Sequence, residues 1–219
     1  MEHVYCGAQQ SRLAQDIIVA TDDFRIYNAV REFGGKVEMT SDKHQSGTDR
    51  MAEVASRVPG DIFVNVQGDE PEITGQVIDQ VVALLADHPE ASVATLVYPI
   101  DSVTAANPNI VKVVCNSHGF ALYFSRAPIP YVRDSHAPPI EYLGHIGIYA
   151  YRRDFLLHYP TLKPSFLEKC EKLEQLRVLE NGYSILTAVS DYRSRGIDTS
   201  EDYREFVIRY RNSQAKSNP

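Results

Sequence analysis

The sequence is poor in cysteine, lacks tryptophan and contains no long apolar run, with three cysteines in 219 residues. Because a helix needs about 18–20 consecutive apolar residues to cross a bilayer, no segment is expected to span a membrane. The cysteines are odd in number, widely spaced and without a Cys-x-x-Cys pair, which predicts reduced, buried thiols in a cytoplasmic protein. The first residues form neither a basic stretch nor an apolar core, so a secretory signal is not expected. The absence of tryptophan excludes nothing.

An excess of basic residues is missing as well, because the net charge is −7 at pH 7. A general nucleic-acid-binding surface needs a basic face for the phosphate backbone, so the charge argues against that class of protein. A few arginines in a pocket can still bind a small anionic ligand. The rest of the composition, with 43% hydrophobic and 23% charged residues, is that of a globular protein with one large or two small domains.

Apolar runs and amphipathic stretches alternate along the chain, which is typical of an α/β fold. The apolar runs predict strands at residues 17–20, 62–66, 92–97, 110–114, 121–124, 146–151 and 184–189. The amphipathic stretches predict helices at residues 3–13, 23–33, 48–56, 74–86, 166–179 and 200–210. The alternation in the first half predicts a mostly parallel sheet covered by helices on both faces.

Two parts of the chain depart from this alternation. Strands cluster within residues 99–151, which predicts a smaller, more antiparallel lobe inserted in a single domain of residues 1–211. The polar tail 212–219 has no periodicity and is expected to be disordered.

The segment 61–71, Asp-Ile-Phe-Val-Asn-Val-Gln-Gly-Asp-Glu-Pro, carries the strongest single signal. Its apolar run stops abruptly at glycine, which predicts a buried parallel strand that delivers Asp69 to the carboxyl edge of the sheet. Ligands of open α/β sheets bind outside that edge, and a carboxylate there suits Mg²⁺, which usually arrives with phosphates. A solvated turn explains the same residues, since Gly-Asp and Glu-Pro commonly end strands.

The segment 17–22, Ile-Ile-Val-Ala-Thr-Asp, predicts a second strand that ends in polar residues at the same edge. Thr21 and Asp22 suit a ligand site there, and they equally suit the cap of the helix that follows.

The segment 44–50, His-Gln-Ser-Gly-Thr-Asp-Arg, precedes an amphipathic helix. Ser46 or Thr48 can cap this helix, and its positive end can hold a polar base or an anion. Arg50 in the first turn opposes the helix dipole, which favours an anionic ligand nearby. A capped helix with a surface arginine is the simpler alternative.

Three later residues are weaker candidates when each is taken alone. His145 begins a strand and can donate a hydrogen bond to a carboxylate or phosphate, although a lone histidine there is more often structural. Glu174 lies three residues before Arg177 in the helix predicted at 166–179, where a solvated face is the simpler interpretation. Asp198 follows a glycine as Asp69 does, but either it or Thr199 can simply cap the last helix.

Taken together and in order, these motifs are more specific than any one of them. The ordered motifs occupy residues 21–22, 44–50, 64–71, 107–109, 123–126, 145–149, 173–177 and 196–199. This series closely resembles the 3-deoxy-manno-octulosonate (Kdo) cytidylyltransferases, and the resemblance runs from Met1 to about Arg209. The paired matches His-Gln-Ser-Gly-Thr and Val-Gln-Gly-Asp-Glu-Pro are the most specific part of it.

The resemblance implies a Rossmann-like nucleotidyltransferase fold and the transfer of CMP from CTP to Kdo, with release of pyrophosphate, for lipopolysaccharide synthesis. By resemblance, the residues around the cytidine are Ala20, Thr21, Asp22 and Ser46. Those facing the sugar acid are Arg50, Gln67, His145, Glu174 and Gln175. Asp69 and Asp198 are expected to hold Mg²⁺, and with Arg50 they form the expected catalytic set. The resemblance also implies a homodimer formed through the smaller lobe, including residues 128–142.

The sequence departs from the family at its start. Family members begin with a strand and a Pro-Ala-Arg…Arg-Leu-Pro-Gly-Lys-Pro loop that grips the triphosphate, whereas Met1 falls where the family's first helix begins. The expectation is that an N-terminal segment is missing from the sequence, and that these 219 residues alone fold poorly or turn over CTP very slowly. Two alternatives stay open, namely a cytidylyltransferase for 8-amino-Kdo or a sialic acid, and a non-catalytic nucleotide-binding remnant.

Overall fold

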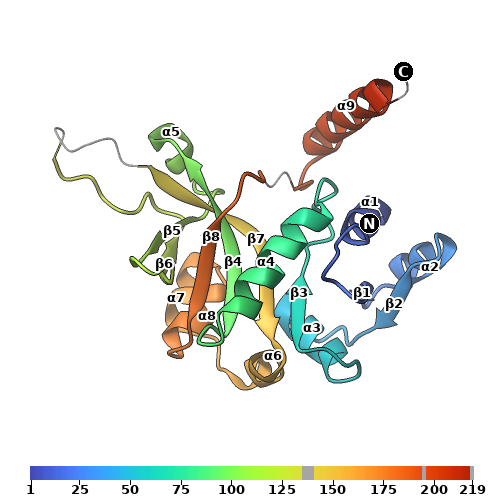
Figure 1. The fold of residues 1–219 in the computed structure, drawn as a ribbon, viewed down its shortest axis with the longest axis horizontal. Coiled ribbons are helices and arrows are strands. Elements are labelled where there is room, and N and C mark those ends of the chain that lie inside the picture. The colour runs from blue at the N-terminus through green and yellow to red at the C-terminus, as the bar shows by residue number, and fades with distance from the viewer. Residues whose placement is uncertain (135–140, 194–195, 218–219) are drawn as a thin grey trace.

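The computed structural model describes residues 1–134, 141–193 and 196–217, and shows a central sheet between two groups of helices (Figure 1). The sheet has six strands, and a separate pair of strands lies beside it. The six are β3 (Ile62–Asn65), β4 (Val93–Ile100), β5 (Lys112–Cys115), β6 (Ala121–Ser125), β7 (Tyr142–Arg152) and β8 (Ile185–Val189). The pair is β1 (Ile18–Thr21) and β2 (Lys36–Met39). The α/β class predicted from the sequence is therefore confirmed.

The prediction of a mostly parallel sheet was wrong for the larger sheet. Its long strand β7 pairs antiparallel with β4 along one edge and with β3 and β5 along the other. Among the described pairings of this sheet only β4 with β8 is parallel. Residues 116–120 connect β5 to β6 by a short turn, and strands joined in this way pair antiparallel, whereas parallel neighbours need a long crossover.

The strands β1 and β3 each have one described partner. β1 pairs in parallel with β2, and β3 pairs with β7, so each retains an edge without a strand partner among the described residues. The predicted buried parallel strand before Asp69 is thus a half-buried strand with an antiparallel neighbour.

Helices cover both faces of the larger sheet, and the side chains of each strand alternate between two cores. On one face, α1 (Glu2–Ala8) and α4 (Gly75–Asp87) pack on apolar residues that include Ala94, Leu96 and Ile146. The other face carries α3 (Gly47–Ala55), α6 (Arg153–His158), a 3-10 turn (Tyr159–Thr161), α7 (Phe166–Glu171) and α8 (Gln175–Glu180). Successive side chains of a strand point to opposite faces of the sheet. Because both faces are buried here, the central strands are almost continuously apolar.

Two helices predicted from the sequence differ in extent. The helix expected at 166–179 is broken into α7 and α8, because Lys172 takes a left-handed conformation with φ 55°. The last helix α9 (Ser200–Ser217) extends through most of the tail expected to be disordered, leaving 218–219 outside the described residues. Good helix formers such as Gln214, Ala215 and Lys216 explain this continuation.

Four short elements were not predicted, and the first helix is shorter than expected. The unpredicted elements are β2, α5 (Ser102–Ala105), α6 and the 3-10 turn, whereas α2 (Phe24–Glu32) was predicted. α1 ends at Ala8, well before residue 13.

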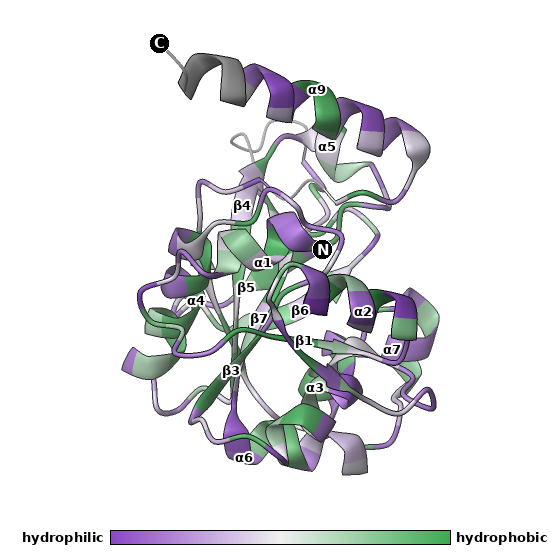
Figure 2. Ribbon diagram, turned by 90° about the vertical axis from the view of Figure 1, so that its right-hand side faces the viewer, coloured by the Kyte–Doolittle hydropathy of each residue, from purple (hydrophilic) through white to green (hydrophobic). Residues whose placement is uncertain are grey.

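The hydropathy of the residues follows this layering (Figure 2). The central strands are mostly hydrophobic, α9 is mostly hydrophilic, and α2 carries residues of both kinds. The thiols are free, as predicted, but Cys6 and Cys170 are exposed rather than buried. Among the residues that the structure describes, none of the helices has the length and apolar character of a membrane span.

Candidate active site

The start of α3 is joined by hydrogen bonds to a distant part of the chain. Ser46 is the N-cap residue, and its Oγ accepts a hydrogen bond from the Asp49 amide at 3.1 Å. The Thr48 hydroxyl donates to Glu174 Oε1 at 2.9 Å and lies 3.3 Å from the Tyr151 hydroxyl. The segment that the sequence predicted as a helix cap is therefore also a contact for Glu174.

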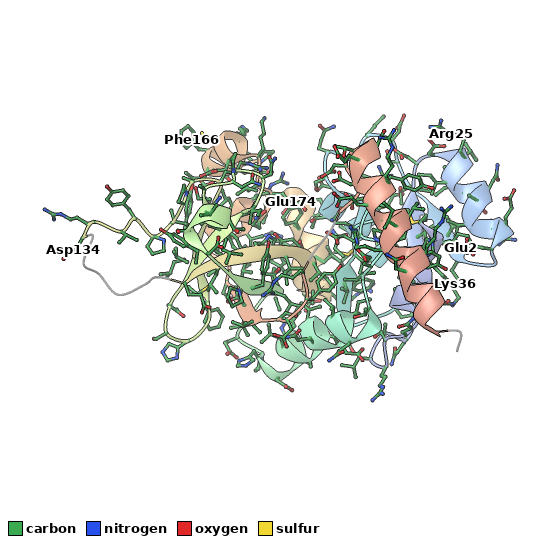
Figure 3. The ribbon with its side chains drawn as sticks, turned by 90° about the horizontal axis from the view of Figure 1, so that it is seen from above. Glu2, Arg25, Lys36, Asp134, Phe166 and Glu174 are labelled. Atoms are coloured by element: carbon green, nitrogen blue, oxygen red, sulfur yellow. The ribbon has the colours of Figure 1, made fainter. Side chains whose placement is uncertain are left out.

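The break between α7 and α8 directs Glu174 toward α3. Lys172 ends α7 in the left-handed conformation, and Leu173 then packs into the core with 6% of its surface exposed. Arg177 forms an ion pair with Glu168 at 2.5 Å rather than with Glu174. The Glu174 carboxyl instead accepts the hydrogen bond from Thr48 on α3. Figure 3 shows Glu174 well inside the outline of the molecule.

Three buried polar atoms near this contact have no hydrogen-bond partner among the described residues. They are Glu174 Oε2, Asn65 Nδ2 and the Tyr159 hydroxyl. Burial raises the pKa of Glu174, because a charged carboxylate loses its hydration there. Since buried polar groups are nearly always paired, unpaired ones call for a ligand or water.

Asn65 and Gln67 approach α3 where it has no side chain. A Cβ placed on Gly47 would lie 3.4 Å from Asn65 Nδ2 and 4.0 Å from Gln67 Nε2. Glycine therefore leaves the two amides open to the first turn of α3. Asn65 is also the cross-strand partner of Tyr149 in β7, which connects this region to the next residue of interest.

His145 lies in β7 with its ring between aromatic neighbours. The ring centroid is 5.2 Å from that of Phe124 and 5.1 Å from that of Tyr149. Burial lowers the pKa of His145 to about 3, so the imidazole is neutral at physiological pH. Its Nε2 lies 3.0 Å from Thr95 Oγ1, on the neighbouring strand β4.

The end of β1 meets α3 through an ion pair. Arg50 Nη2 lies 3.0 Å from Asp22 Oδ2, and Arg50 Nη1 donates to Thr40 Oγ1 at 2.5 Å. Thr21 is buried, and its Oγ1 accepts a hydrogen bond from the Asp23 amide at 3.1 Å. Asp23 itself caps α2, so Asp22 is not the cap and its carboxylate faces the arginine.

Two further predicted residues lie near the end of a strand and at the start of a helix. Ala20 is half-buried in β1 opposite Glu38 of β2. Gln175 begins α8, directly after Glu174, and is buried with 6% of its surface exposed.

Asp69 and Asp198 are brought together by a backbone contact between their loops. The Ile197 amide donates to the Asp69 carbonyl at 2.9 Å, and a Cβ on Gly196 would lie 3.8 Å from Asp69 Oδ2. The cap of α9 is formed by Thr199, whose Oγ1 accepts a hydrogen bond from the Asp202 amide at 3.2 Å. The Asp198 carboxylate is therefore not needed to cap α9.

The donor set at this edge suits Mg²⁺. Both carboxylates are exposed, and in the described part of the chain neither makes a hydrogen bond or ion pair. No cluster of three or more His, Cys, Asp or Glu side chains within the described residues can form a metal cage. Mg²⁺ differs from cage-bound metals because it is commonly held by one or two carboxylates together with waters and substrate phosphates.

The described contacts thus gather predicted residues in two groups. One, at the start of α3, includes Ser46, Arg50 and its partner Asp22, and Glu174. The other is the pair Asp69 and Asp198, whose loop after β3 also carries Gln67, whereas His145 contacts Thr95 and two aromatic rings. Sequence reasoning missed Thr48 as a contact of Glu174, and it assigned no role to Asn65 or Thr95. A threonine inside the apolar run 92–97 was the available signal for Thr95.

Comparison with known proteins identifies the class to which this fold and site belong. The family model for cytidylyltransferases matches residues 1–185 of the chain. The chain therefore belongs to the cytidylyltransferase family, a group of nucleotidyltransferases.

Individual relatives are more specific. The chain is 46% identical to the 3-deoxy-manno-octulosonate cytidylyltransferase of Geotalea daltonii over 95% of its own length and 87% of the relative. It is 47% identical to the enzyme of that name from Geobacter sulfurreducens, over 94% of the chain and 87% of the relative. A solved CMP:2-keto-3-deoxy-manno-octonic acid synthetase complexed with CTP matches with a TM-score of 0.90 and 43% identity, covering 98% of this chain and 87% of that chain. A cytidylyltransferase from Leptospira borgpetersenii, 14% identical over 93% of this chain and 72% of that chain, shares the fold with a TM-score of 0.58.

Proposed function

We propose that this protein transfers CMP from CTP to the anomeric hydroxyl of Kdo and releases pyrophosphate. The observation that carries the proposal is the hydrogen bond of 2.9 Å that joins the loops of Asp69 and Asp198, in a chain so similar to a synthetase solved with CTP. Two carboxylates that can hold Mg²⁺ suit a nucleoside triphosphate as the donor, and the unpaired Glu174 Oε2 and Asn65 Nδ2 suit a polyhydroxylated acceptor.

The proposed roles follow the two groups of residues. Ala20, Thr21, Asp22 and Ser46 surround the cytidine, and Arg50, Gln67, His145, Glu174 and Gln175 hold the sugar acid. Asp69 and Asp198 hold Mg²⁺, which when bound neutralises charge on the phosphates and lowers the pKa of the attacking hydroxyl. The hydroxyl gives up its proton to solvent, and its oxygen bonds to the α-phosphorus as the bond to pyrophosphate breaks in line with it. Because Asp22 is assigned to the cytidine and Arg50 to the sugar acid, their ion pair supports a role for the arginine between the two substrates.

Pyrophosphate release from CTP tests the proposal directly. We expect release only when CTP, Mg²⁺ and Kdo are all present, with a product of the mass of CMP-Kdo. The kcat/KM for 8-amino-Kdo or a sialic acid, supplied in competition with Kdo, should be at least about tenfold lower than that for Kdo. A site that hydrogen-bonds particular substrate hydroxyls rejects analogues that leave its own polar groups unpaired. Binding of CTP without pyrophosphate release for any of these acids would contradict the proposal.

Replacing Glu174 by glutamine is expected to stabilise the protein and weaken binding of the sugar acid. The pKa of Glu174 in the folded protein is raised above its ordinary value of 4.5, so folding favours the protonated carboxyl. The free energy of unfolding of the wild type therefore falls as the pH rises above 4.5. Glutamine does not titrate, so E174Q should melt higher than wild type at pH 7, with the gap closing toward pH 4. The KM for Kdo should rise about tenfold, because glutamine presents an amide donor where the unpartnered Oε2 of Glu174 can accept from a sugar hydroxyl.

The control is Glu32→Gln, which changes an exposed carboxylate on α2. It should alter neither the melting temperature nor the KM for Kdo. If the difference in melting temperature between E174Q and wild type is the same at pH 4 and pH 7, the raised pKa of Glu174 is contradicted.

We also propose a cytoplasmic homodimer. The thiols are free, as in reducing compartments. Of the segment 128–142 expected at the interface, residues 135–140 lie outside the described part. In the described part, Tyr131 is 87% exposed and Val103 on α5 is 81% exposed, beside an apolar cluster of Ile100, Ala105 and Tyr142. Light scattering should give twice the 24.6 kDa chain mass, and Tyr131→Asp should reduce it to the monomer.

A further inference from the structure

The hydrogen bonds around Thr95 determine which nitrogen of His145 carries the proton. Thr95 Oγ1 lies 2.6 Å from the Ile148 carbonyl, 3.2 Å from the Ile146 carbonyl and 3.0 Å from His145 Nε2. A threonine hydroxyl has one proton to donate. Two oxygens 2.6 Å apart repel each other unless that proton lies between them, so it is donated to Ile148.

Because its proton is committed, Thr95 Oγ1 can only accept from His145. The imidazole must then carry its proton on Nε2 and leave Nδ1 as an unprotonated acceptor. The ring has no other hydrogen bond among the described residues. The packing of Phe124 and Tyr149 against the ring gives no carboxylate that would stabilise a second proton.

A β-bulge explains why a threonine stands at this position. The pairing of β4 with β7 shifts between Thr95 and Leu96, so Gly147 and Ile148 have no partner in the ladder. The Ile148 carbonyl is consequently free to accept from a side chain rather than from the β4 backbone. Thr95 satisfies this carbonyl and the histidine with a single hydroxyl.

We propose that Thr95 is a positioning residue that holds His145 as the Nε2–H tautomer, so that His145 accepts a hydrogen bond from a substrate hydroxyl through Nδ1. The identity of the hydroxyl as one on the sugar acid rests on the proposed function. This differs from the interpretation drawn from the sequence, in which His145 donates to a carboxylate. A neutral ring whose proton already binds Thr95 has no donor left for an anion.

Nitrogen-15 NMR of the histidines in the 219-residue protein tests the tautomer without reference to activity. The signal of His145, one of seven histidines, is assigned by its loss in His145→Asn. We expect the Nε2–H form at neutral pH, with a proton protected from exchange with water. In Thr95→Val, which keeps the side-chain shape without the hydroxyl, this proton should exchange about tenfold faster, and Thr95→Ser should restore its protection.

Steady-state kinetics test the contact with the substrate. Thr95→Val should raise the KM for Kdo about tenfold and leave the KM for CTP unchanged, and Thr95→Ser should recover the wild-type value. A wild-type His145 in the Nδ1–H or doubly protonated form would overturn the proposal, as would a Thr95→Val protein with unchanged proton exchange. If wild type turns over no sugar acid, the proposed function fails while the NMR result still decides the tautomer.

Discussion

Asp69→Asn should reduce pyrophosphate release by about a thousandfold or more while leaving the melting temperature unchanged. Asparagine keeps the shape of the side chain but removes the charge that holds Mg²⁺, and a metal contributes several kcal/mol of transition-state stabilisation. The fold should tolerate the change because Asp69 is exposed and its carboxylate makes no hydrogen bond or ion pair among the described residues. The measurement is the initial rate across a Mg²⁺ titration at saturating CTP and Kdo.

The matched control lies at the other end of the same strand. Asp61 is also exposed and immediately precedes β3, so Asp61→Asn removes an equivalent charge away from the proposed metal. Its rate should stay within about twofold of wild type. If Asp69→Asn keeps more than about a tenth of the wild-type rate at every Mg²⁺ concentration, the metal assignment is wrong.

Lys112→Met should lower the free energy of unfolding by about 3–5 kcal/mol, because it leaves buried acceptors without a donor. Lys112 is completely buried in β5. Its Nζ donates to the carbonyls of Asn107 at 2.9 Å, Ile110 at 2.6 Å and Arg126 at 2.6 Å. Burial lowers the pKa of this ammonium, and the three carbonyls supply the contacts that replace water. Methionine fills a similar volume but donates nothing. Urea denaturation monitored by circular dichroism measures the loss.

Lys163→Met is the control, because Lys163 is exposed. Its free energy of unfolding should change by no more than about 0.5 kcal/mol. A loss below about 1 kcal/mol in Lys112→Met would show that water or a local rearrangement satisfies the three carbonyls.

Much of the candidate site could be predicted because its residues follow strong local rules. An apolar run that ends in Gly-Asp predicts a strand and the loop after it, and β3 ends at Asn65 shortly before Asp69. Ser46 was expected to cap a helix, and its Oγ does accept the Asp49 amide. Such features depend on neighbours a few residues away, and therefore appear in the sequence itself.

Errors arose where the decisive partner lies far along the chain. Apolar spacing of three residues suggested one helix over 166–179, but the core position of Leu173 and the contact of Glu174 with Thr48 accompany a break at Lys172. Alternation of apolar residues predicted β7 as a strand, yet it carries no information on the direction of its neighbours.

The chain alone thus establishes the α/β class, the order of the motifs and the chemistry of the residues at the ends of its strands, because these follow from local propensity and apolar period. Folding decides which of those residues meet. The Ile197–Asp69 hydrogen bond joins the Asp198 and Asp69 loops, and the bulge in β7 places the Ile148 carbonyl beside Thr95. Both contacts depend on strand register and loop packing between segments widely separated in sequence, which local patterns do not encode.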